Sequence, residues 1–102
     1  MSWMDVHYIY RGQQFVWDAA KAIENRAKHG IGFEVACEVF FDPEQESEEA
    51  TADDEFRLAV IGMTTHSQLL YVVHVEREGQ QIRIISAREV STRERTLYED
   101  CG

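Results

Sequence analysis

The chain has 102 residues, of which 44% are hydrophobic and 28% charged, and its formal net charge is −9. This composition is typical of a folded globular protein and excludes a disordered chain, and the length suits one hydrophobic core, so we expect a single domain over residues 1–102. No apolar run reaches the roughly 18 residues that a membrane helix needs, which favours a cytoplasmic protein without membrane contact. Cys37 and Cys101 lack the spacing of metal ligands, and we predict neither a disulfide nor a metal or other cofactor.

The negative charge is concentrated in one segment. Residues 42–55 contain no Lys or Arg, and their acidic residues are Asp42, Glu44, Glu46, Glu48, Glu49, Asp53, Asp54 and Glu55. The remainder of the chain has 11 acidic and 10 basic residues and is nearly neutral. A charge of −9 argues against nucleic-acid binding, but this distribution weakens that argument. We predict that residues 42–55 form an acidic loop.

The N-terminal part predicts a strand and two helices. Residues 1–10 alternate weakly, as in an edge strand or a loose extension, and residues 13–17 indicate a short strand. Asp18 is a suitable N-cap for a helix over residues 19–29, with Gly30 after its end. Its small residues, among them Ala19, Ala22 and Ile23, predict the packed face, whereas Lys21, Asn25 and Lys28 lie on the opposite face. Phe33, Ala36, Cys37 and Phe40 have the spacing of a second amphipathic helix.

The C-terminal part predicts a meander followed by a helix. Strands are expected over residues 56–63, 69–77 and 80–88, the last two joined by a two-residue turn at Glu78 and Gly79. Ser91 and Glu94 have the spacing of a capping box that starts a helix running towards Asp100. We therefore predict an α+β fold: a small antiparallel sheet, made of the N-terminal strand and the meander, packed with two N-terminal helices and a C-terminal helix.

A two-residue turn would place His74 directly opposite Arg83, with both side chains on one face. Arg57 joins them if residue 57 lies opposite residue 74; a slip of one residue sends it to the other face. His74 is then either a hydrogen-bonded core histidine or a general acid–base group beside an arginine that binds phosphate. Lys28 either complements the helix dipole or binds a ligand, and Tyr98 is either an anchor or a stacking ring.

Several motifs together resemble the BrnT family of bacterial type II toxin–antitoxin toxins. They are Phe15, Trp17, Asp18, Lys21, Asn25, Lys28, His29, Gly30, Ile31 and Phe33; Arg57, Ile61 and Gly62; His74 and Glu76; the run from Arg83 to Arg88; and Glu94, Arg95, Tyr98 and Glu99. The resemblance covers residues 13–99 and leaves residues 1–12 as an N-terminal extension. It implies a RelE-like fold and a metal-independent endoribonuclease that blocks translation. It also implies a BrnA-like antitoxin of ribbon-helix-helix type, with operator DNA bound only through the complex and assembly as a homodimer or a heterotetramer with antitoxin.

By analogy with RelE-like enzymes, an RNA 2′-hydroxyl would attack the adjacent phosphate. For this reaction we assign proton transfer to His74, a choice made from its place in the sequence and not supplied by the family. Arg83 and Arg57 would hold the phosphate, with Lys28, Arg88 and Tyr98 as outer RNA contacts. Two alternatives stay open: a non-catalytic module that docks the antitoxin, and an acidic adaptor that binds a basic partner through residues 42–55. Convergence of Arg57, His74, Arg83 and Lys28 in one concave patch away from the acidic loop would favour the nuclease. If Arg83 and His74 faced a hydrophobic core or different sides of the sheet, the non-catalytic module would be favoured.

Overall fold

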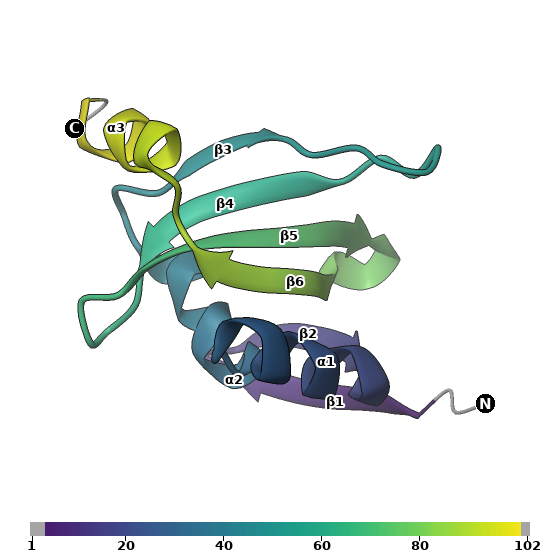
Figure 1. Cartoon of the computed structure of the whole chain (residues 1–102). Coiled ribbons are helices and arrows are strands. Elements are labelled where there is room, and N and C mark those ends of the chain that lie inside the picture. Colours follow the sequence, from purple (N-terminus) through teal and green to yellow (C-terminus); the bar gives the residue numbers. More distant parts are fainter. Residues whose placement is uncertain (1–3, 101–102) are drawn as a thin grey trace.

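The structure, a computed structural model that describes residues 4–100, is built on one six-stranded mixed sheet with the order β1-β2-β6-β5-β4-β3 (Figure 1). The strands are β1 (Asp5–Tyr10), β2 (Gln13–Asp18), β3 (Glu46–Glu49), β4 (Leu58–Met63), β5 (Leu69–Arg77) and β6 (Gln81–Glu89). Neighbouring strands pair antiparallel, except that β2 and β6 pair in parallel. This parallel pairing joins the N-terminal hairpin to the meander.

The sheet is larger than the sequence predicted. Residues 5–10 form an edge strand, and the segment predicted to be an acidic loop, residues 42–55, contributes the other edge strand, Glu46–Glu49. Glutamates are poor strand formers, but an edge strand has one open side where charged residues are tolerated and oppose aggregation. Composition alone therefore predicted the wrong structure for the middle of this segment.

The helix boundaries agree with the predictions. α1 (Ala19–His29) begins at Asp18, whose Oδ2 accepts a hydrogen bond from the Lys21 amide at 3.0 Å, and it ends at Gly30, which has a φ of 73°. The predicted second helix is divided into α2 (Phe33–Ala36) and the 3-10 turn η1 (Cys37–Phe41), and another 3-10 turn, η2 (Glu78–Gln80), joins β5 to β6. α3 (Thr92–Asp100) begins with the predicted capping box between Ser91 and Glu94. Among the described residues, no helix has the length and apolarity to cross a membrane.

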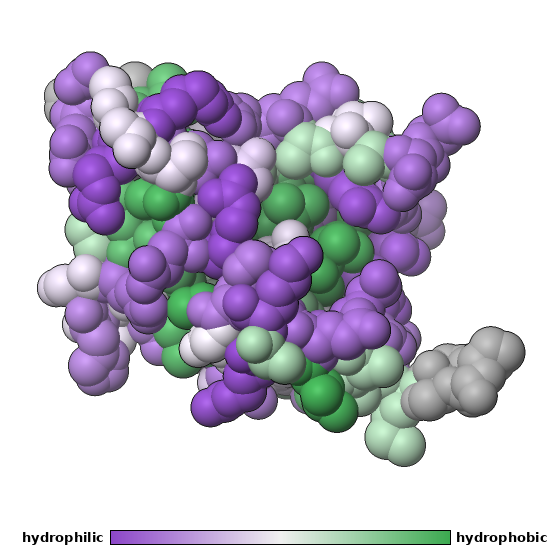
Figure 2. Space-filling view, viewed as in Figure 1, coloured by the Kyte–Doolittle hydropathy of each residue, from purple (hydrophilic) through white to green (hydrophobic). Residues whose placement is uncertain are grey.

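The orientation of α1 agrees with the prediction only in part: Ala22 packs against the core, as predicted, but the helix is rotated about its axis. Ile23, predicted to pack against the core, is 72% exposed, whereas Asn25 on the polar side is only 7% exposed. The polar side of α1 therefore faces β6, and α1 and α3 lie on either side of strands β4 to β6 in Figure 1. Figure 2, in the same view, shows hydrophobic side chains between these helices and a mostly hydrophilic surface around them.

The main core lies between the sheet and the segment formed by α2 and η1. Its largest buried side chains include Phe15, Trp17, Phe33, Leu70, Val72 and Ile84. Gly62 on β4 lets η1 approach the sheet closely, because a Cβ at this position would lie 2.8 Å from the Val39 carbonyl oxygen. This close contact between backbones brings Val39 into the core, where it is fully buried.

We expect Gly62→Ala to lower the free energy of unfolding by about 1–3 kcal/mol, because the added methyl group forces η1 away from the sheet. Denaturant unfolding would measure this change. Gly32→Ala is the matched control, since its Cβ would meet a flexible Arg26 side chain at 3.0 Å instead of backbone. Equal losses in the two variants would contradict the explanation.

Candidate functional site

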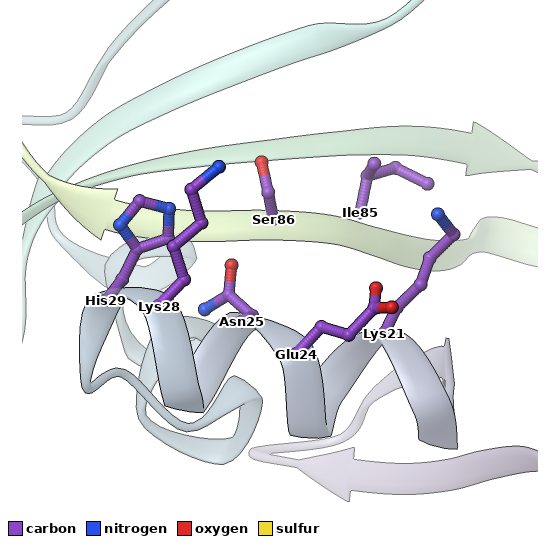
Figure 3. A pocket seen from close by; sticks show the side chains of 7 residues that line it. All are labelled: Lys21, Glu24, Asn25, Lys28, His29, Ile85 and Ser86. Carbon is purple, nitrogen blue, oxygen red and sulfur yellow. The ribbon is translucent and has the colours of Figure 1, made fainter.

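A cleft lies between α1 and β6 and is lined mainly by polar side chains (Figure 3). Its lining residues are Lys21, Glu24, Asn25, Lys28, His29, Ile85 and Ser86. Positions 21, 25 and 28 follow one another at helical spacing, so these three side chains share the side of α1 that faces the strand. We call this feature the α1–β6 cleft.

The cleft exists because β2 leaves β6 after a short pairing. The two strands are in register only at Phe15 opposite Ile82 and Val16 opposite Arg83, and the chain then turns into α1. Further along β6, the Asn25 side chain takes the place of a strand. Its Nδ2 donates to the Ala87 carbonyl at 2.9 Å, and its Oδ1 accepts from the Ala87 amide at 3.0 Å.

Asn25 also ties the end of α1 to the chain that follows it. The same Nδ2 donates to the Ile31 carbonyl at 3.1 Å. Asn25 is therefore a buried polar side chain whose amide group is fully used by the backbone, which satisfies groups that would otherwise be costly to bury. Through it, one residue fixes the distance between α1 and β6 and so the width of the cleft.

The cationic groups of the cleft are not neutralised within the protein. Lys21 and Lys28 are the two lysines of the entire chain, and both line this cleft. Over residues 4–100 neither of them makes an ion pair, nor does His29, while Glu24 is the single carboxylate of the lining. Two ammonium groups and an imidazole beside one carboxylate favour an anionic ligand.

Most arginines, by contrast, are held by carboxylates. Ion pairs join Arg57 to Glu55, Arg83 to Asp5, Arg88 to Glu94, Arg93 to Glu48, and Arg95 to Glu99. The cationic residues that the sequence singled out as phosphate ligands, Arg83 and Arg57, are both in this group. In the described residues, the lysines are thus more available than these arginines to bind an anion.

The predicted alignment of His74 with Arg83 is wrong. The connection between β5 and β6 has three residues, so that Arg77 lies opposite Gln81, and a β-bulge follows between Val73 and His74. His74 is consequently opposite Ile84, and Arg83 is opposite Val75. Since successive residues of a strand point to opposite faces, His74 and Arg83 lie on different faces of the sheet.

Arg57 does not join His74 either. The residue opposite His74 on the neighbouring strand is Leu58, one position later than predicted. The Arg57 Nε instead lies 3.0 Å from the Glu55 carboxylate. The structure therefore does not bring the predicted trio of His74, Arg83 and Arg57 together, and Lys28 lies in the separate α1–β6 cleft.

His74 is a core residue. It is 2% exposed, its ring packs edge-on against Phe40 with the ring centroids 4.8 Å apart, and its Nδ1 has no hydrogen-bond partner among the described residues. Burial lowers the pKa of His74, and this effect outweighs the opposite influences of the Val72 backbone and of Glu76, whose Oε2 lies 3.7 Å from the imidazole Nε2. His74 is thus a buried, neutral imidazole near physiological pH.

Arg88 and Tyr98, predicted to be RNA contacts, hold α3 in place. The Arg88 guanidinium makes two hydrogen bonds of 2.9 Å to the buried Glu94 carboxylate. The Tyr98 hydroxyl donates to Asp42 Oδ2 at 2.6 Å, and burial together with this bond raises the pKa of Tyr98 to about 12. Burial alone would raise the pKa of Asp42, but hydrogen bonds from Tyr98 and from backbone amides lower it.

Lys21, Asn25, His29 and Ser86 are the candidate residues that the sequence-based assignment missed. They occur in its motifs, but α1 was expected to turn its small residues inward, which left the polar side in solvent. The available signal was the spacing of Lys21, Asn25 and Lys28, which places an amide between two lysines on one helix face. Over residues 4–100, no group of three His, Cys, Asp or Glu side chains is arranged to hold a metal ion.

We expect Asn25→Ala to lower the free energy of unfolding by roughly 2–4 kcal/mol, because the buried backbone groups of Ala87 and Ile31 lose their partner. Chemical denaturation would measure the loss. Glu24→Ala, on the adjacent position of the same helix, is the control and should change stability by less than about 0.5 kcal/mol. A similar small effect of both substitutions would show that Asn25 does not fasten α1 to β6.

His74 should make the protein less stable in mild acid. Because its folded-state pKa is lowered, the unfolded chain takes up a proton below about pH 6.5 that the folded protein excludes, so stability falls as the pH drops through this value. His74→Leu should flatten the dependence between about pH 7.5 and pH 5.5, measured by urea unfolding. Asp42 and Glu94, whose carboxyl pKa values are lowered, change the stability in a more acidic range, near pH 4. An unchanged slope in the variant would contradict this assignment.

Comparison with known proteins gives the family. Residues 17–94 match the family model described as "Ribonuclease toxin, BrnT, of type II toxin-antitoxin system", a range that includes the entire lining of the α1–β6 cleft. The fold is similar to that of the Brucella abortus ribonuclease toxin BrnT, seen in a crystal structure, with a TM-score of 0.51, 23% identity, and coverage of 74% of this chain and 94% of that one. No curated protein matches the chain significantly. Because the family model spans most of its length, the chain belongs to the BrnT family of ribonuclease toxins of type II toxin–antitoxin systems.

Proposed function

We propose that this protein is an endoribonuclease toxin that cleaves RNA in the α1–β6 cleft and thereby inhibits translation. Family membership supplies the class of activity. The proposed location of the active site rests on one observation. Both lysines of the chain line this cleft, and they make no ion pair over residues 4–100. RNA affinity depends on neutralising phosphates, and an acidic protein needs a local concentration of cationic residues to achieve it.

The proposed reaction is metal-independent attack of a 2′-hydroxyl on the adjacent phosphate. Such a reaction needs a base for the hydroxyl proton, cations to stabilise the charge that develops on the phosphate oxygens, and an acid for the leaving oxygen. Lys21 and Lys28 are suited to the second task, since their ammonium groups carry the positive charge without a metal ion. His29, beside Lys28, offers an imidazole for proton transfer, and the Ser86 hydroxyl offers a hydrogen bond from the strand side.

The assignment of proton transfer to His74, with Arg83 and Arg57 on the phosphate, stays a prediction. His74 and Arg83 would have to act on one phosphate from different faces of the sheet, whereas Lys21, Lys28 and His29 already share a cleft. This separation also favours a second candidate function, a non-catalytic module of the same fold that docks the antitoxin. The two functions differ in whether the protein cleaves RNA.

We further propose, from the resemblance to the family, that the fold is RelE-like and that the protein acts in the cytoplasm. Its partner would be a BrnA-like ribbon-helix-helix antitoxin that binds operator DNA in complex with it, as a heterotetramer or around a toxin homodimer. Such an antitoxin can neutralise the toxin by blocking RNA binding. Covering the α1–β6 cleft would accomplish this.

Induced expression of the wild type should arrest growth and fragment cellular RNA, and Lys28→Ala should relieve both effects. Removing one group that stabilises transition-state charge costs about 10²–10³ in rate, so purified Lys28→Ala should cleave RNA roughly 100-fold more slowly. His74→Ala in the same assay decides between the two sites. Arg95→Ala, which removes an exposed cation on α3, is the matched control and should leave cleavage unchanged.

Lysine chemistry gives an independent readout of the same proposal. RNA fragments should protect Lys21 and Lys28 from an amine-reactive reagent, as followed by mass spectrometry, because no other lysine competes for it. Cleavage that survives Lys28→Ala but not His74→Ala would move the active site to β5. Intact RNA with a well-folded, soluble wild type would favour the non-catalytic module.

A further inference from the structure

A second hollow, which shares no lining residue with the α1–β6 cleft, surrounds Glu76 near the end of β5. Two adjoining depressions share this residue, and we call them together the Glu76 groove. Phe56, Leu58 and Val75 give it an apolar wall, and Arg77, Gln80 and Gln81 give it a polar one. Its lining differs from that of the α1–β6 cleft, because it contains the exposed phenyl ring of Phe56 and no lysine.

The apolar wall contains an aromatic ring that the fold leaves uncovered. Phe56 precedes β4 and is 61% exposed, although the sheet buries Phe15 and Phe33 almost completely. The adjacent Leu58 is half-buried and supports the groove from below. An exposed ring beside an aliphatic floor is suited to stack against a flat aromatic ligand, as the bases of single-stranded RNA do on protein aromatics.

The polar wall contains acceptors and donors that the protein does not use. The Glu76 side chain is 67% exposed, and its Oε2 lies 3.7 Å from the Nε2 of the neutral His74 imidazole, beyond hydrogen-bond distance. His74 itself lines the groove as a buried imidazole whose Nδ1 lacks a partner among the described residues. Arg77, which is exposed, also lines the groove and makes no ion pair within residues 4–100. As the next residue along β5, it leaves the strand on the opposite face from Glu76.

We propose that the Glu76 groove binds one unpaired base of the substrate RNA and selects bases that carry an exocyclic amino group: adenine, cytosine or guanine. Phe56 stacks on the base, the Glu76 carboxylate accepts the amino hydrogen, and Arg77 lies where a neighbouring phosphate can approach. Uracil has no amino group. Its N3–H, the one donor that its edge offers to the Glu76 carboxylate, lies between two carbonyl oxygens that the carboxylate repels. This inference rests on the proposed function, since it makes the groove a specificity subsite of an RNA-binding toxin.

Binding of short fluorescein-labelled oligonucleotides tests whether the Glu76 groove prefers bases that carry an amino group. The probes are a uridine hexamer and the same hexamer with one central adenosine or cytidine. We expect the wild type to bind the substituted hexamers about tenfold more tightly, and Phe56→Ala to weaken that binding roughly tenfold through lost stacking. Glu76→Gln should remove the preference, because an amide can also donate to uracil. Glu78→Gln removes an equal charge two residues away and should retain it.

The same substitutions in cleavage mapping should move the cut sites without abolishing cleavage, which distinguishes them from Lys28→Ala. NMR titration with adenosine, cytidine and uridine tests base binding without depending on nuclease activity. Resonances of Phe56 and His74 should shift with the first two nucleosides and remain nearly unchanged with uridine. Equal responses to all three, or resonances that respond only to a protein partner, would overturn the proposal even if the protein proves to be a ribonuclease.

Discussion

The pairing of Asn25 with the backbone of Ala87 is the interaction on which the rest of the architecture depends. β2 must leave β6 early so that α1 can form, and a buried strand edge without a partner would be costly. A single amide side chain has one donor group and one acceptor, as a strand residue does, and it fills the vacancy from the helix. The arrangement keeps α1 at the sheet with little apolar contact, since Ala22 packs against the core but is only partly buried.

That solution explains how an acidic protein has a cationic cleft. Because a polar contact fastens α1 to the sheet, the positions one turn to either side of Asn25 can carry Lys21 and Lys28 at the rim of the contact. The carboxylates elsewhere hold Arg83 and Arg88 in structural ion pairs, which removes them from competition for an anion. Net charge therefore says little about what such a protein binds, and the sign of each unpaired group says more.

Local signals in the sequence were sufficient to predict the positions of the helices and of most strands. The Asp18 cap, the Gly30 end and the Ser91–Glu94 capping box are short-range features, and all three are present. The candidate site was not predictable in the same way, because one extra residue in the η2 turn and a bulge beside His74 decide which side chains share a face. The orientation of α1 depends on a strand edge 62 residues away in the chain, which no local pattern reports.

The contacts of α3 have a consequence for how the molecule opens. Its one fully buried residue is Glu94, and its contacts include the Arg88, Glu48 and Asp42 side chains. A helix held largely by charge-assisted hydrogen bonds gains little from the hydrophobic effect, so its docking is more sensitive to ionic strength than the rest of the fold. α3 can then act as a separate cooperative unit that detaches before the sheet unfolds, giving the protein a locally unfolded form within its native ensemble.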